Sequence, residues 1–174
     1  MKPPRRLEVY TLGRAATVYA VRDPDRPHRD PDRFFLDADV RSSSDLRALA
    51  NRVRRAGPKR GFRDGWFRSE RGAWALYAPH PDGAPELDQR FPPSLRLYCL
   101  RLFQDRIVVL GHGGLKTTPT FQDDPVLHDA VRDLEALDKR LQARIDLGDV
   151  RLARDPAGHY LLEGRLTFDP DDIP

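Results

Sequence analysis

The chain has 174 residues, of which 39 % are hydrophobic and 33 % are charged, and its formal net charge is +3. These values are typical of one globular domain, and no apolar run approaches the ~18 residues of a transmembrane helix. A single cysteine excludes an internal disulfide, and the N-terminus leads into no apolar signal segment. We therefore expect a cytoplasmic protein with no membrane partner.

The N-terminal part of the chain predicts two strands and a helix. Residues 7–12 and 16–21 are rich in β-branched and aromatic side chains, which predicts a hairpin. Prolines and charges then predict an exposed, disordered loop over residues 23–33. From about Ser44 to Ala56, apolar residues recur at helical spacing between a serine N-cap and a Gly-Pro stop, which predicts a helix.

Positive charge is concentrated at the end of this helix and in the loop after it. Residues 47–71 contain nine basic and two acidic side chains, a net charge of +7, with Trp66 and Phe67 among them. Cations can follow a phosphate backbone while aromatic rings stack on bases. The RNA-binding candidates are Arg54, Arg55, Lys59, Arg60 and Trp66. The alternative is a solvated helix face with two core aromatics.

The C-terminal part predicts most of a sheet and a long helix. Strands are predicted over residues 73–78, 95–102 and 106–110, with a proline-rich loop over 79–94 and a glycine turn over 111–119. Asp124 is the predicted cap of a leucine-rich helix that begins at Pro125 and ends at Gly148. A hairpin extension follows over about 149–168, and the acidic tail after it could weaken the attraction of a basic face for phosphate.

Metal and cofactor chemistry have no matching pattern in this sequence. The five histidines are far apart and the lone cysteine has no partner, which argues against a zinc site. Phosphate-binding P-loop, dinucleotide-binding and serine-hydrolase motifs do not occur. We therefore expect no metal and no cofactor.

The remaining chemical signal is cationic. Lysine is scarce, with four lysines against 26 arginines, and Lys116 follows the pair Gly113–Gly114. Arginine binds phosphate as a planar fork and lysine as a mobile point charge. In a regular strand Arg96 and Tyr98 face one side and Arg101 faces the other, so the two arginines need not share a site. Each cation could instead pair with an acid.

Residues 96–122 run in the order Arg-x-Tyr, an apolar strand, a Gly-Gly turn, lysine and threonine, before a leucine-rich helix. This order resembles the second half of the RelE/HigB-type toxins of bacterial type II toxin–antitoxin pairs, over roughly residues 73–145. The resemblance implies an α+β fold, an antiparallel β-sheet with two main helices packed on one face, as a single domain over residues 1–174 with the C-terminal β-hairpin. It also implies a metal-independent endoribonuclease that cleaves mRNA, usually within the ribosome, and a helix-turn-helix antitoxin as partner.

The catalytic candidates are Arg96, Arg101, Lys116 and Tyr98, which the resemblance assigns, and His112, which lies beside the glycine turn. The resemblance implies that the cations stabilise the phosphate that the RNA 2′-hydroxyl attacks, that Lys116 could instead act as a base, and that Tyr98 stacks on a base. His112 could donate a proton or be a structural histidine. At Leu115 the chain departs from relatives that carry a second lysine. Catalysis requires Lys116 and an arginine on one exposed concave face. The alternative is a non-catalytic protein- or RNA-binding module on the same scaffold, regulated by a helix-turn-helix partner.

Overall fold

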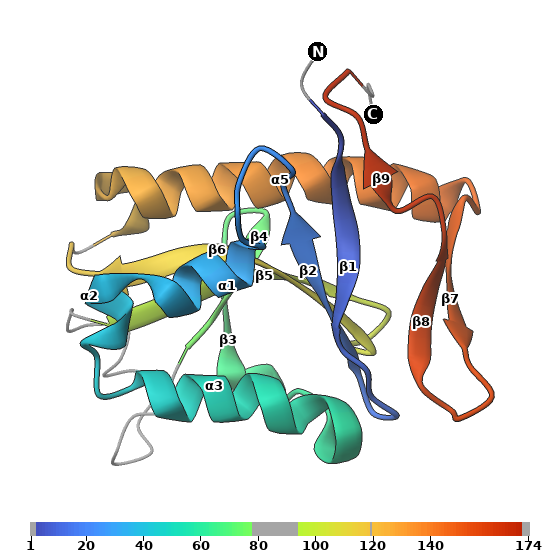
Figure 1. Ribbon diagram of the computed structural model, residues 1–174, viewed down its shortest axis with the longest axis horizontal. Helices are drawn as coiled ribbons and strands as arrows, with labels where there is room; N and C mark the ends of the chain where they lie inside the picture. Colours follow the sequence, from blue (N-terminus) through green and yellow to red (C-terminus); the bar gives the residue numbers. More distant parts are fainter. Residues whose placement is uncertain (1–2, 78–93, 119, 172–174) are drawn as a thin grey trace.

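A computed structural model describes residues 3–77, 94–118 and 120–171 and contains a seven-stranded sheet between helices (Figure 1). The strand order is β3-β4-β5-β6-β2-β1-β9, and every neighbouring pair is antiparallel except β2 and β6. Strands β7 and β8 form a separate two-stranded sheet. The fold is therefore the predicted α+β type with a mainly antiparallel sheet. The predicted loop over 79–94 lies, apart from Ser94, outside the described residues, as does Pro119.

The strands of the large sheet are β1 (Arg5–Thr11), β2 (Thr17–Arg22), β3 (Phe67–Glu70), β4 (Ala73–Leu76), β5 (Ser94–Leu102), β6 (Ile107–Lys116) and β9 (Thr167–Phe168). The small sheet consists of β7 (Val150–Arg154) and β8 (Tyr160–Gly164). The helices are α1 (Asp30–Leu36), α2 (Ala38–Arg41), α3 (Leu46–Arg55) and α5 (Pro125–Asp146), with short helical turns η1 (Ala56–Arg60), η2 (Asp64–Trp66) and η3 (Phe121–Asp123). None of the described helices combines the length and apolar character needed to cross a bilayer.

Both faces of the central strands are apolar, and this places helices on both sides of the sheet. Residues 107–110 of β6 are all fully buried, so each face of the strand needs a cover. Helix α5 packs on the face that carries Tyr98 and Val109. Helices α1, α2 and α3 cover the opposite face, where Phe34 and Leu49 enter the core. The resemblance placed the two main helices on one face; in the structure α3 and α5 lie on opposite faces (Figure 1).

Helix α1 begins inside the segment that the sequence predicted as a disordered loop, residues 23–33. Pro31 lies in its first turn, where a missing N–H removes no helical hydrogen bond, and Asp30 and Asp32 lie at the positive end of the helix dipole. Buried Phe34 anchors the helix on the sheet. The loop prediction was wrong over residues 30–33 because a seven-residue helix is too short to show an apolar period among so many charges.

Residues 111–116 extend strand β6, so the predicted glycine turn is wrong. The pairing with β5 shifts once within this segment, which gives β6 one extra residue, a bulge. A Cβ atom at Gly111 would lie 2.8 Å from the Leu134 side chain of α5, and one at Gly113 would lie 1.9 Å from the Arg96 carbonyl oxygen. The glycines therefore allow α5 and β5 to approach β6 closely.

The C-terminal hairpin is present as predicted, and the chain then returns to pair β9 with β1. Arg140 and Arg144 of α5 donate to backbone carbonyl oxygens of residues 165–170. The Asp169 carboxylate pairs with Arg165 at 3.2 Å. The first residues of the acidic tail, Asp169 and Pro170, are therefore held against α5, whereas residues 172–174 lie outside the described residues.

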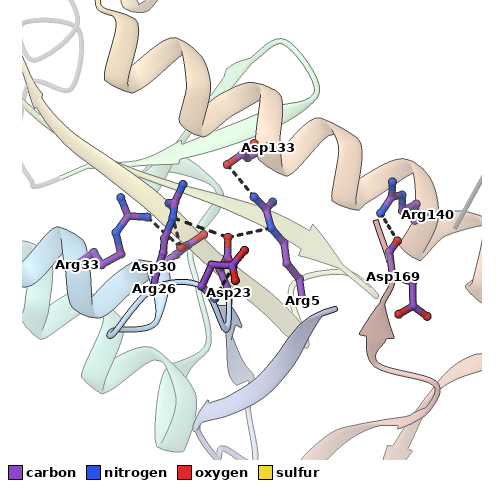
Figure 2. A network of polar contacts seen from close by, with 9 residues as sticks. Arg5, Asp23, Arg26, Asp30, Arg33, Asp133, Arg140 and Asp169 are labelled. Carbon is purple, nitrogen blue, oxygen red and sulfur yellow. Dashed lines mark hydrogen bonds and ion pairs between the residues drawn. The ribbon is translucent and has the colours of Figure 1, made fainter. Parts of the chain in front are cut away.

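A chain of ion pairs links α5, β1 and α1 across the edge of the sheet (Figure 2). Asp23, whose side chain is 3 % exposed, pairs with Arg5 at 3.4 Å and with Arg26 at 3.7 Å. Arg5 reaches Asp133 of α5 at 3.3 Å, and Arg26 reaches Asp30 of α1 at 3.9 Å. Each buried carboxylate thus has cationic partners, and the segment between β2 and α1 is tied to the sheet.

Candidate nucleic-acid interface

A groove lined by cations lies at the C-terminal end of α3. Its first hollow, of about 370 Å³, is lined by Arg54, Arg55, Pro58, Lys59 and Arg60. A second hollow of about 270 Å³ shares Arg55 and Arg60 and is lined in addition by Ala48, Asn51, Arg52, Arg63 and Trp66. We call the two together the basic groove. No carboxylate among the described residues lines it, and it contains all five RNA-binding candidates.

The local sequence explains why the cations gather here. Leu49 and Val53 form the buried stripe of α3, so the arginines around them point to the surface. The helix ends in the wider turn η1, and cations in the last turn face the negative end of the helix dipole. The carbonyl oxygen of Gly57 accepts hydrogen bonds from the backbone N–H groups of Ala15 and Ala16, both at 3.1 Å. The turn that carries the groove is therefore fixed to the β1–β2 turn.

Trp66 supplies the aromatic surface of the groove. Its ring lies 5.0 Å from the Arg52 guanidinium and 6.0 Å from that of Arg63, and it packs edge-on against Phe62 at 6.2 Å. Phe67, the other aromatic of the segment, is buried in the core below α3. The groove thus combines one half-buried ring with planar cations, whereas Phe67 is the core residue that the alternative interpretation expected.

The five catalytic candidates are divided between the two faces of the sheet. Arg96, Tyr98 and Lys116 lie on the face covered by α5, close to Glu70. Arg101 lies on the other face, where its guanidinium contacts Phe67, as strand alternation predicted. His112 lies on that face too, beside α1. The structure therefore brings three of the five together.

Those three belong to a buried cluster of Arg68, Glu70, Arg96, Tyr98 and Lys116. The Arg96 side chain is 0 % exposed, with Nε 3.7 Å from the Glu70 carboxylate, and the Tyr98 hydroxyl donates to Glu70 at 2.7 Å. Lys116 is 4 % exposed, and burial, followed by the charge of Arg96, lowers its pKa while Glu70 opposes the shift. Burial and the adjacent Glu70 raise the pKa of Tyr98. No member of this set presents a broad surface to solvent.

Glu70 is the residue that sequence reasoning missed. Its carboxylate contacts both Arg96 and Tyr98 and so links strand β3 to strand β5. Glu70 and Tyr98 are 28 residues apart in the sequence. The only signal of Glu70 in the sequence was an acid in a basic segment, which the sequence predicted as a loop and the structure shows to contain strand β3. Strand pairing through β4 was needed to place it opposite the arginine.

The guanidinium of Arg101 contacts two carboxylates and two aromatic rings. It bonds to Asp105 at 2.7 and 2.8 Å and to Asp64 at 2.7 Å, and it lies 4.3 and 4.4 Å from the rings of Phe67 and Trp74. These hydrogen bonds raise its pKa. The arrangement fixes the β5–β6 turn and also occupies the carboxylate of Asp64, close to the basic groove.

Comparisons with protein-family models, curated proteins and solved structures found no match. The resemblance to RelE/HigB-type toxins therefore depends on the sequence pattern alone. Within residues 3–77, 94–118 and 120–171, no three histidine, cysteine or acidic side chains are grouped so that they could hold a metal ion.

The imidazole of His112 is uncharged near neutral pH. Burial, and then the charge of Arg33, lowers the pKa of His112 to about 4, and its Nδ1 atom is buried without a hydrogen-bond partner among the described residues. An unfolded histidine has a pKa of about 6.5. Between these values the unfolded chain binds a proton that the folded protein does not, so folding stability falls as the pH is lowered.

We predict that His112→Gln flattens this pH dependence. In the wild type, this one histidine lowers the free energy of unfolding by up to ~1.4 kcal/mol per pH unit as the pH falls from about 6.5 to about 4. The glutamine variant lacks that contribution. Urea unfolding at a series of pH values measures it. Equal slopes for the two proteins over this interval would contradict the assignment of a neutral buried imidazole.

Proposed function

We propose that the protein binds single-stranded RNA through the basic groove. The observation that carries the proposal is the composition of the groove, which has six cations, one accessible aromatic ring and no lining acid among the described residues. The six cations are Arg52, Arg54, Arg55, Lys59, Arg60 and Arg63. A surface of this composition attracts a polyanion.

The chemistry of the groove favours an unpaired strand over a duplex. Lysine and arginine neutralise successive phosphates and release their counterions, which makes the affinity depend on salt. Unpaired bases stack on aromatic rings and on guanidinium planes, whereas the bases of a duplex are stacked on one another. Trp66, with Arg52 and Arg63 beside its ring, offers both kinds of plane.

We predict that Arg55→Gln together with Arg60→Gln weakens RNA binding and its salt dependence. Both residues line both hollows of the groove. For a single strand each lost phosphate contact lowers the slope of log K against log salt by about 0.7, so the pair should lower it by about 1.4. Fluorescence anisotropy at several salt concentrations measures the slope.

The matched control removes the same charge elsewhere. Arg41 and Arg47 are exposed arginines outside the groove, and their double glutamine variant should retain a slope close to that of the wild type. An equal loss of slope in the two double variants would show that only net charge matters and that the groove is not the site.

The second candidate function is that of a metal-independent endoribonuclease, the toxin of a toxin–antitoxin pair with a helix-turn-helix antitoxin. The buried cluster favours it, because it holds Lys116, with a lowered pKa, beside Arg96 and Tyr98. Cleavage by the RNA 2′-hydroxyl needs cations at the phosphate and a group that moves protons. This function also requires the cluster to open, since Arg96 is 0 % exposed.

For this candidate we predict that induced expression arrests bacterial growth and that Lys116→Met relieves the arrest. Methionine keeps the length of the side chain and removes its charge. Lys139→Met, on the exposed side of α5, is the control and should remain toxic. Growth curves and soluble protein levels are measured together. Wild-type protein that does not slow growth, or equal arrest by both variants at equal soluble levels, would contradict the toxin function.

A further inference from the structure

We propose that the bound RNA continues from the basic groove, past the β1–β2 turn, to a second contact on the C-terminal hairpin. This contact, the hairpin patch, consists of Arg106, Arg154 and Tyr160. The proposal rests on the proposed RNA-binding function and extends it, because it assigns a role to the hairpin and makes the ligand a strand long enough to reach both places.

Segments that are far apart in the sequence meet along one edge of the molecule. The Gly57 carbonyl oxygen in η1 accepts from the N–H groups of the β1–β2 turn, and the Gly13 carbonyl oxygen in that turn accepts from the N–H of Tyr160 at 3.1 Å. The Arg106 carbonyl oxygen in the β5–β6 turn accepts from Thr17 at 2.9 Å. Figure 1 shows the end of α3, the β1–β2 turn and the hairpin turn along its lower edge. The groove and the hairpin patch are thus joined through one turn.

The hairpin patch has the same composition as the aromatic part of the groove. The Arg154 guanidinium lies 4.2 Å from the centre of the Tyr160 ring, and that of Arg106 lies 5.6 Å from it. Arg154 also donates a hydrogen bond to the Tyr160 hydroxyl. In the groove, two arginines stand beside Trp66 in the same way. Each place offers planar groups on which one unpaired base can stack.

Cross-strand pairing within the hairpin places an acid opposite Arg151 and not opposite Arg154. Arg151 faces Glu163 across the hairpin and forms an ion pair with it at 3.1 Å, whereas Arg154 faces Tyr160. Within the part of the chain that the structure describes, Arg106 and Arg154 form no ion pair.

Two acids in the turns at this edge have partners of their own. Asp105 binds Arg101, and Asp155 binds His159 at 2.8 Å. The exposed Arg14 lies in the β1–β2 turn, between the groove and the hairpin patch. Arg14 thus adds a cation between the two aromatic rings, along the path that a phosphate backbone would follow.

The experiment measures how affinity grows with the length of the RNA. Labelled single-stranded RNAs of about 4, 8, 12 and 16 nucleotides, the range of site sizes of single-strand binders, are titrated with the full chain. The test variant is Arg106→Gln together with Arg154→Gln, with Tyr160→Leu as a second variant that keeps an apolar contact with the core. The control is Arg151→Gln together with Arg165→Gln, which removes the same charge from exposed positions on or beside the hairpin.

The shortest RNA should bind the wild type and both test variants equally, because it fills the groove alone. The longest RNA should bind the test variants about tenfold more weakly than the wild type, as expected for the loss of one stacked base. The control should keep the affinity of the wild type for every length. Equal affinity of wild type and test variants for the longest RNA overturns the hairpin contact, and the groove stands. A wild type that binds none of the RNAs overturns the proposed function as well.

Discussion

The close contact between Gly13 and Gly57 is the constraint on which the proposed binding surface depends. A Cβ atom at Gly13 would lie 2.0 Å from the Ala16 carbonyl oxygen and 2.2 Å from that of Gly57, so only glycine allows the two turns to meet. The contact fixes the end of α3 against the β1–β2 turn, and that turn in turn accepts the backbone N–H of Tyr160. The groove and the hairpin patch are thus both hydrogen-bonded to the β1–β2 turn.

The arginines inside the protein and the cations of the basic groove differ in their surroundings. On the α5 face, Arg96 is fully buried and shares Glu70 with Tyr98, and on the α3 face Arg101 is held by two carboxylates and two rings. Buried charges need such partners because their desolvation is costly. Among the described residues no acid lines the basic groove, and for this reason we propose the groove, rather than the strand arginines, as the site of an anionic ligand.

The sequence allowed correct prediction of features that are local or strongly periodic. The apolar stripe and aspartate cap of α5, the C-terminal hairpin and the gathering of Arg54, Arg55, Lys59 and Arg60 at one helix end all follow from spacing along the chain. The opposite placement of Arg96 and Arg101 followed from strand alternation alone. These features need no knowledge of strand order.

The features that the sequence did not reveal depend on partners distant along the chain. Strand β6 continues through Gly111 and Gly113 because α5 and β5 approach it too closely for a larger residue. The sequence alone does not show this approach, since a Gly-Gly pair is equally typical of a turn. The parallel pairing of β2 with β6 joins residues about 90 positions apart, and Glu70 meets Arg96 only after β3, β4 and β5 have paired. The contact of the hairpin with the β1–β2 turn is of the same kind.

The most direct measurement is an NMR titration of the isotopically labelled full chain with a single-stranded RNA of about four nucleotides, the smallest single-strand site size. We predict that the Trp66 indole N–H and the backbone amides of residues 54–57 and 59–61 shift first, in proportion to the RNA bound, and that the shifts shrink as salt is added. Shifts confined to the α5 face around Arg96 and Lys116, with Trp66 unchanged, would contradict it and place the RNA at the buried cluster instead.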